Sequence, residues 1–129
     1  MPDNNYLDWV IRNTRTCWWH DSADPAELQL GLDRGAVGVT TNPFLSSVSF
    51  AKNRARWEAE TNAILARNLP AEEKAEALMR IVVTQAAGMY QHIYEKSGGT
   101  AGFVCAQVNP SRAGLHGPLL GQHAQCAGH

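Results

Sequence analysis

The sequence predicts an α/β fold in which short parallel strands alternate with helices. Three short runs rich in β-branched and aromatic residues have the composition and length of strands, and amphipathic segments separate them. Parallel strands need long crossover connections, which are usually helical. A chain of 129 residues, of which 44% are hydrophobic, is long enough to bury the core of one domain. We therefore expect one α/β domain with a parallel sheet.

The first elements are a short helix and a strand. Apolar residues recur at helical spacing directly after two residues that suit an N-cap, Asn4 and Asn5, so the sequence predicts a helix near residues 6–11. Residues 14–20 follow, where Thr, Cys and Trp favour extended backbone, and they end in a polar cluster at residues 21–24. We predict the first strand over residues 14–20.

A strong helix-start signal comes next, formed by Asp24, Pro25 and Glu27. An N-cap carboxylate, proline at the first helical position and glutamate at the third all stabilise a helix N-terminus. This signal predicts a helix of about ten residues, a usual length for a globular helix, which ends at Gly35, a residue type that suits a C-cap. Asp24 is therefore interpreted as a capping residue.

The rest of the domain is predicted as one strand, two helices and one strand. Residues 36–39 are too few and too β-branched for a helix and are predicted as a strand buried on both faces. Beyond Pro43 the pattern turns helical, with one helix expected over residues 50–67 and a second from Pro70 to Gly98-Gly99, and the second has the clearest amphipathic spacing. Residues 100–108 are predicted as the third strand. Two helices are thus expected to connect the second and third strands.

Composition excludes several classes of partner. A net charge of −1 and a pI near 6.5 are not typical of nucleic-acid binders, and no run of like charges indicates an anionic membrane surface. The first residues do not have the pattern of a secretory signal, and no apolar run reaches the roughly 20 residues of a membrane span. Three cysteines at long separations fit neither a disulfide framework nor a zinc knuckle, so we expect a reducing cytoplasm.

The C-terminal residues differ from the domain before them. Residues 1–110 are expected to form the domain, and residues 111–129 are a tail rich in Gly, His and Gln, predicted to be loop or disordered. A zinc site in this tail is an alternative whose possible ligands follow no recognised spacing: His116, His123, Cys126 and His129. We expect no metal and no cofactor.

Polar residues follow each predicted strand at its carboxyl end, where parallel α/β sheets bind ligands. Asp21, Asn42 and Gln107 are the three candidates. Asn42 could also only shape a turn before Pro43, and the partner of the Gln107 amide, expected to be buried, could be backbone, water or substrate. His20, beside two tryptophans, is predicted to be a packed strand residue.

Three motifs give the chain a resemblance to the first part of a transaldolase, over roughly residues 14–114. They are Asp21 after the first strand, Gly38-Val39-Thr40-Thr41-Asn42-Pro43 after the second, and Ala106-Gln107-Val108-Asn109-Pro110 on the third. The Thr-Thr-Asn-Pro element is the specific one, and the other two agree with it in position and order. The resemblance implies the N-terminal part of a (β/α)8 TIM barrel, and the metal-free aldolase chemistry of sugar-phosphate metabolism in the non-oxidative pentose phosphate route.

In that family a lysine forms a Schiff base with a ketose phosphate, and the bound dihydroxyacetone unit passes to an aldose phosphate. Carried over to matching positions, the resemblance implies that Asp21 is the acid/base for the sugar hydroxyl and that Asn42 hydrogen-bonds the bound dihydroxyacetone unit. Thr40 and Gln107 would help to place a catalytic water. Gln107 replaces the glutamate of many transaldolases and is similar to fructose-6-phosphate aldolases, so transfer and aldol cleavage both stay open.

The sequence also departs from the family. The Schiff-base lysine of transaldolases lies on the fourth strand. This chain has only three lysines, and all of them lie between its second and third predicted strands: Lys52, Lys74 and Lys96. A TIM barrel needs about 200 to 250 residues. We therefore expect a truncated or frame-altered chain that is inactive alone, with open sheet edges that favour self-association. The alternative is a catalytically dead fragment that serves as a binding module.

Overall fold

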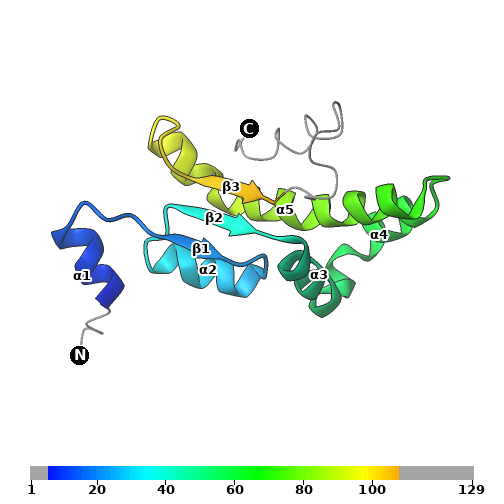
Figure 1. Ribbon diagram of the computed structural model, residues 1–129, viewed down its shortest axis with the longest axis horizontal. Coiled ribbons are helices and arrows are strands. Elements are labelled where there is room, and N and C mark those ends of the chain that lie inside the picture. The colour runs from blue at the N-terminus through cyan, green and yellow to red at the C-terminus, as the bar shows by residue number, and fades with distance from the viewer. Residues whose placement is uncertain (1–5, 108–129) are drawn as a thin grey trace.

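Three short parallel strands form the centre of the fold. A computed structural model describes residues 6–107, with β1 at Trp19–Asp21, β2 at Gly38–Thr41 and β3 at Phe103–Ala106 (Figure 1). The strand order is β1-β2-β3, and both pairings are parallel. Helices connect the strands, so the predicted α/β class is confirmed, and the arrangement is that of part of a TIM barrel.

The first helix is confirmed, but the first strand is shorter than predicted. α1 spans Tyr6–Asn13, and the N–H and hydroxyl of Thr14 both donate to the Val10 carbonyl, at 3.0 and 2.7 Å, which prolongs the helical turn. Pairing with β2 begins only at Trp19, and Asp21 is a strand residue rather than the start of the loop. Strand propensity over residues 14–18 therefore has no effect where no neighbouring strand is available.

The second helix begins and ends as predicted. α2 spans Pro25–Asp33, and the Asp24 carboxylate accepts the N–H groups of Ala26 and Glu27 at 3.0 and 3.2 Å. Gly35 has a φ of 78°, the left-handed conformation of a helix C-terminus. β2 lies two residues later than the predicted residues 36–39, so it includes both threonines of the Thr-Thr-Asn-Pro element.

The connection from β2 to β3 contains three helices rather than two. α3 spans Pro43–Lys52, a 3₁₀ turn η1 spans Arg54–Trp57, and α4 spans Glu58–Leu65. The single helix predicted over residues 50–67 is therefore wrong: Asn53 leaves helical backbone, with its side-chain Nδ2 bonded to the Ser49 carbonyl at 2.9 Å. α5, at Ala71–Lys96, is confirmed.

The third strand is also shorter than predicted. Before β3, the Ser97 hydroxyl accepts the N–H groups of Thr100 and Ala101 at 3.2 and 3.0 Å, and Gly102 has a φ of 85°. These bonds form a tight turn instead of strand, because the N–H groups are already satisfied locally. The predicted end at residue 108 lies outside the described residues.

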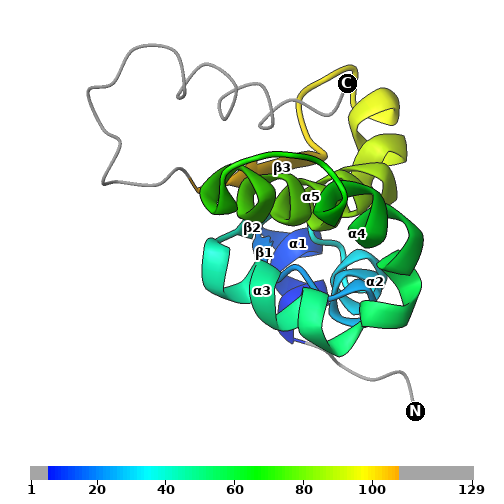
Figure 2. The same ribbon diagram turned by 90° about the vertical axis from the view of Figure 1, so that its right-hand side faces the viewer.

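The core lies between one face of the sheet and the helices below it. Val39 and Val104 are buried there against side chains of α2 and α5: Leu28, Val83, Ala86 and Tyr90. The Tyr90 hydroxyl donates to the Leu28 carbonyl at 3.5 Å, and burial raises the pKa of Tyr90 to about 12. Figure 1 shows α2 and α5 beside the strands and α1 apart from them at the N-terminal end, and Figure 2 views the molecule from the end at which α4 lies.

The opposite face of the sheet carries Trp19, Asp21 and Thr40. Side chains alternate between faces along a strand, and these residues alternate with the partly buried His20 and with the buried Val39 and Thr41. Trp19 is 42% exposed and Asp21 is exposed. In the described part of the chain this face is open, which is the face that a complete barrel turns towards its interior.

Two further observations concern partners. No helix within residues 6–107 has the length and apolar content to cross a membrane, and no group of three metal-ligating side chains occurs there. The predicted domain boundary after residue 110, the tail and its alternative zinc ligands lie outside the described residues.

Candidate functional site

The three candidate residues lie at one end of the sheet. Asp21 is the last residue of β1, Asn42 directly follows β2, and Gln107 directly follows β3. Because all pairings are parallel, these positions share the carboxyl edge of the sheet. The fold therefore brings residues 21, 42 and 107 to one region, as the sequence predicted.

Asp21 and Thr40 form the first pair of this site. They are direct partners in the β1–β2 register, and the Thr40 hydroxyl donates to Asp21 Oδ1 at 2.9 Å. A hydroxyl donor fixes the orientation of a carboxylate without taking its proton-accepting capacity. The pair lies on the open face and is exposed, so a ligand on that face can reach the carboxylate.

Asn42 has the local role that the sequence left open. It is the N-cap of α3, with Oδ1 accepting the Leu45 N–H at 2.8 Å, and Pro43 occupies the first turn. Capping uses only the amide oxygen, so both hydrogens of Nδ2 are available to a ligand. The Asn-Pro pair thus builds the helix and still presents donors at the strand end.

Gln107 is exposed, which corrects the expectation of a buried amide. Its backbone N–H donates to the Thr41 carbonyl at 3.2 Å and continues the β2–β3 pairing by one residue. A cavity of about 60 Å³ lies beside it and is also lined by Asn42, Ser46 and Arg80. Since a water occupies about 30 Å³ of liquid, this cavity holds one or two waters or a small polar group.

The site therefore consists of two pairs. Asn42 and Gln107 share the small cavity, whereas Asp21 and Thr40 are bonded to each other and do not line it. A much larger cavity, of about 1110 Å³, lies elsewhere, between α4 and α5. The aldolase chemistry that the sequence predicts needs the residues at the strand ends, so the larger cavity is not its expected site.

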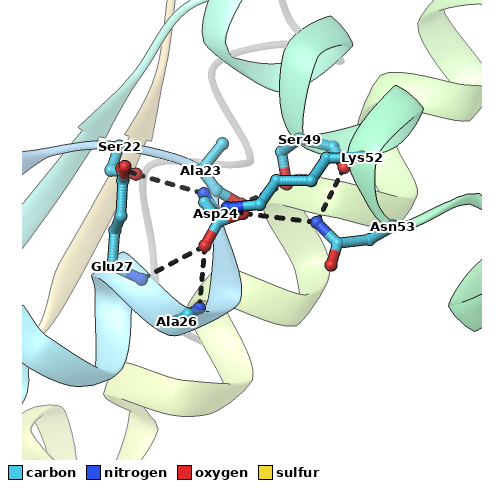
Figure 3. Close-up of polar contacts among 8 residues, drawn as sticks. All are labelled: Ser22, Ala23, Asp24, Ala26, Glu27, Ser49, Lys52 and Asn53. Atoms are coloured by element: carbon cyan, nitrogen blue, oxygen red, sulfur yellow. Dashed lines mark hydrogen bonds and ion pairs between the residues drawn. The ribbon is translucent and has the colours of Figure 1, made fainter.

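A polar cluster fastens the loop after β1 to α3 (Figure 3). Asp24 Oδ2 binds Lys52 Nζ at 2.9 Å and accepts from Asn53 Nδ2 at 3.4 Å, while its Oδ1 caps α2. The Ser49 hydroxyl donates to the Ala23 carbonyl at 2.8 Å. We call Asp24, Ser49, Lys52 and Asn53 the Asp24 cluster. It holds the segment that follows Asp21 against the helix that begins after Asn42.

The Asp24 cluster shifts the pKa values of its charged groups. Burial raises the pKa of Asp24, but the hydrogen bonds from Lys52, Asn53 and the α2 backbone outweigh burial, and the pKa lies below the usual 3.8. The hydrogen bond to Asp24 raises the pKa of Lys52. The Lys52 amine is therefore held protonated and is a poor nucleophile.

The other two lysines are also unsuited to covalent catalysis at this edge. Lys74 Nζ donates to the Leu65 carbonyl at 3.0 Å. Lys96 is the last residue of α5 and precedes β3, which places it towards the amino end of the strands. No lysine of this chain is thus presented as a free amine beside Asp21 and Asn42.

Asp24→Asn is expected to lower the free energy of unfolding by about 1 kcal/mol at pH 7, the upper range for a partly exposed ion pair. Asparagine keeps the N-cap but loses the charge that binds Lys52. Because the folded-state pKa of Asp24 is lowered, its stabilisation is present above the unfolded value of 3.8 and disappears as pH falls through the folded value.

The measurement is urea unfolding of both proteins between pH 3 and 7, near the usual range of carboxyl pKa values. The difference between wild type and Asp24→Asn is expected to shrink below pH 4. Lys52→Met, which removes the partner, serves as the matched variant and is expected to weaken the same pH dependence. An equal difference at every pH would contradict this role of the charge.

Sequence reasoning expected helical structure beyond Pro43 but assigned no separate helix that starts there, and it missed the Asp24 cluster. The signal for α3 was present, because Asn42-Pro43 repeats the cap-and-proline order of Asp24-Pro25. The cluster had no such signal, since Lys52 and Asn53 are ordinary helix-end residues until the fold sets them beside Asp24. His20 is confirmed as a packed residue: its ring lies edge-on to the Trp18 ring, with the two ring centroids 5.7 Å apart.

Comparison with known proteins gives a consistent set of relatives. No family model matches the chain. It is 30% identical over 97 residues to a transaldolase of Neisseria meningitidis serogroup C (strain 053442), covering 71% of this chain and 27% of that protein. Transaldolases of Neisseria gonorrhoeae and Mycolicibacterium smegmatis are also 30% identical, over 74% of this chain. The chain spans a little over a quarter of the length of these relatives: 27 to 28%.

Proposed function

This chain belongs in part to the transaldolase family, and we propose that it supplies one side of a ketose-phosphate site. The observation that supports this most directly is that two pairs, Asp21 with Thr40 and Asn42 with Gln107, lie at the same carboxyl edge of parallel strands. The substrate class is a sugar phosphate. In the complete reaction a dihydroxyacetone unit is transferred from a ketose phosphate to an aldose phosphate, in the non-oxidative pentose phosphate route of the cytoplasm.

Each residue has a role that its contacts support. Asp21, oriented by Thr40, is the acid/base for the sugar hydroxyl whose deprotonation drives carbon–carbon cleavage. Asn42 donates from Nδ2 to an oxygen of the dihydroxyacetone unit, because its Oδ1 is engaged by α3. Gln107, with Thr40, helps to place a water. An amide accepts no proton at neutral pH, so Gln107 acts by hydrogen bonding alone.

We propose that this chain by itself binds the ketose without covalent chemistry. Lys52 is paired with Asp24, Lys74 with a carbonyl, and Lys96 lies at the other end of the sheet. The Schiff base of the family therefore requires a lysine outside this sequence. Within the described residues β1 and β3 each pair on one side only, and we propose that these open edges also favour self-association.

The proposed site is tested by titrating the isotope-labelled full chain with fructose 6-phosphate and following NMR shifts. The Asn42 side-chain NH₂ and the Thr40 and Gln107 amides are expected to move together. Asn42→Ser keeps a good N-cap but has no amide, so the affinity is expected to fall about fivefold, the value of one hydrogen bond of about 1 kcal/mol.

Ser47→Ala is the matched control, because Ser47 lies on the exposed side of α3 and its hydroxyl bonds only the Phe44 carbonyl, at 2.8 Å. Its affinity is expected to equal that of wild type. Unchanged affinity of Asn42→Ser, or shifts confined to α4 and α5, would overturn the proposed site.

A further inference from the structure

The small cavity at the N-terminus of α3 is lined by polar groups that have no role in the proposed ketose chemistry. Its volume is about 60 Å³, and the first turn of α3 contributes Asn42, Pro43 and Ser46 to its lining. Glu76 and Arg80 line it from α5. Neither Ser46 nor Arg80 takes part in the proposed ketose chemistry, so their presence in one cavity needs a different explanation.

The Ser46 hydroxyl is the first observation that indicates a ligand. Ser46 is only 2% exposed, and its hydroxyl has no hydrogen-bond partner within residues 6–107. Its backbone N–H, by contrast, donates to the Asn42 carbonyl at 3.0 Å. Ser49, the other buried serine of α3, donates its hydroxyl to the Ala23 carbonyl at 2.8 Å. Since buried hydroxyls are normally hydrogen-bonded, an acceptor atom in the cavity would supply the partner that Ser46 lacks.

The other groups around the cavity favour an anion as the source of that acceptor. A helix N-terminus carries about half an elementary positive charge and readily binds anions. Arg80 is exposed, and its guanidinium forms no ion pair or hydrogen bond with the part of the chain that the structure describes. Its fork of N–H donors matches two oxygens of a carboxylate or phosphate. Asn42 adds the donors of Nδ2, because the helix cap engages only Oδ1.

Glu76 opposes an anion, because its carboxylate belongs to the same lining. Glu76 has an interaction partner of its own, so it does not depend on the cavity for one. The formal charges of Glu76 and Arg80 cancel, which leaves the helix N-terminus and the neutral donors to decide the sign of the preferred ligand. These groups favour an anion, and the opposing carboxylate is expected to keep its affinity low.

We propose that this cavity binds a small oxyanion, a carboxylate or a phosphate group, whose oxygens accept hydrogen bonds from Ser46, Arg80 and Asn42. Liquid water occupies about 30 Å³ per molecule, so a cavity of about 60 Å³ has room for about two oxygen atoms. The oxyanion therefore inserts one edge, and its other atoms stay on the exposed side beside Arg80. Binding needs neither a carbonyl group nor a lysine, so this site does not rest on the proposed ketose chemistry.

The test is an NMR titration of the isotope-labelled full chain with inorganic phosphate, at an ionic strength held constant with sodium chloride because salt screens surface charges. The Ser46 amide and the Arg80 side-chain N–H are expected to shift along one saturation curve. Ser46→Ala and Arg80→Gln are each expected to weaken binding at least about tenfold, the effect of one hydrogen bond to a charged group. Glu76→Gln is expected to bind phosphate more tightly than wild type, because it removes the opposing charge.

Arg56→Gln is the matched control for Arg80→Gln. Arg56 is also exposed, and it lines the larger cavity between α4 and α5 but not the small one. The two variants change the net charge equally, so Arg56→Gln is expected to bind phosphate like wild type. Because Arg80 is exposed, its replacement leaves the fold intact even if Ser46→Ala does not. Equal phosphate affinity of wild type, Arg80→Gln and Arg56→Gln would overturn the proposal.

Competition identifies the source of the oxyanion. Fructose 6-phosphate and fructose are each added to the chain saturated with inorganic phosphate. Displacement by fructose 6-phosphate alone would show that the phosphate group of a sugar fills the cavity, whereas displacement by neither would assign the cavity to a separate oxyanion. Both results support the site. Failure of ketose binding with intact phosphate binding would contradict the proposed function and leave this inference standing.

Discussion

Replacing Gly102 by alanine is expected to lower the free energy of unfolding by about 2 to 5 kcal/mol, the sum of left-handed backbone strain and overpacking. Gly102 has a φ of 85°. A Cβ there would clash with the Tyr94 nitrogen and would lie 2.9 Å from the Tyr90 carbonyl oxygen. These are backbone atoms of α5, which cannot turn aside as a side chain can.

The position of Gly102 makes this clash costly for the whole sheet. Its N–H donates to the Val37 carbonyl at 2.6 Å, and β3 begins at the next residue. Moving the backbone away from α5 would therefore disturb β3 and its pairing with β2. Since a domain of ordinary stability has about 5 to 15 kcal/mol in total, the loss is a large fraction of it.

Urea unfolding, followed by tryptophan fluorescence and circular dichroism, measures this effect against two matched glycines. Gly98 has a φ of 64° but nothing within 4 Å of a Cβ, so Gly98→Ala is expected to cost only the strain of about 1 to 2 kcal/mol. Gly88 is an exposed helical residue with open space, so Gly88→Ala is expected to stabilise by about 1 kcal/mol. Equal losses in Gly102→Ala and Gly98→Ala would show that the clash with α5 has no effect.

Incubation of the chain with fructose 6-phosphate and borohydride is expected to give no covalent adduct. Schiff-base formation needs an unprotonated amine beside the substrate carbonyl. Asp24 holds Lys52 protonated, the Lys74 amine donates to the Leu65 carbonyl, and Lys96 lies at the end of α5, towards the amino end of the strands. A transaldolase that contains its own Schiff-base lysine is expected to form an adduct with the same ketose, so the two proteins are expected to give opposite results.

Intact-mass spectrometry measures the adduct, with the full-length transaldolase of Neisseria gonorrhoeae as positive control. Ketose binding is followed separately in the NMR titration, so absence of an adduct is distinguished from absence of binding. A specific adduct that maps to Lys52 and is lost in Lys52→Arg would show that the Asp24 pair does not suppress its reactivity.

Local signals predicted the parts of this fold that depend on neighbouring residues. The α2 start at Asp24-Pro25 and its end at Gly35 were correct, because caps and left-handed glycines act within one helical turn. The same logic applied to Asn42-Pro43 would have placed the start of α3. Strand limits were less accurate: β1 begins only where pairing with β2 begins, and β3 begins only after the turn bonds of Ser97, and such bonds are not visible in propensity.

The sequence by itself determined the family, the α/β class and the presence of Asp21, Asn42 and Gln107 at strand ends, because motif order and hydrophobic period are properties of the chain. Only the tertiary structure decided which side chains meet. The Thr40–Asp21 bond joins residues 19 apart and needs the β1–β2 register, and the Asp24–Lys52 pair needs α3 to pack beside the loop after β1. Such contacts depend on how elements pack, and distant residues are brought together only when the whole core forms.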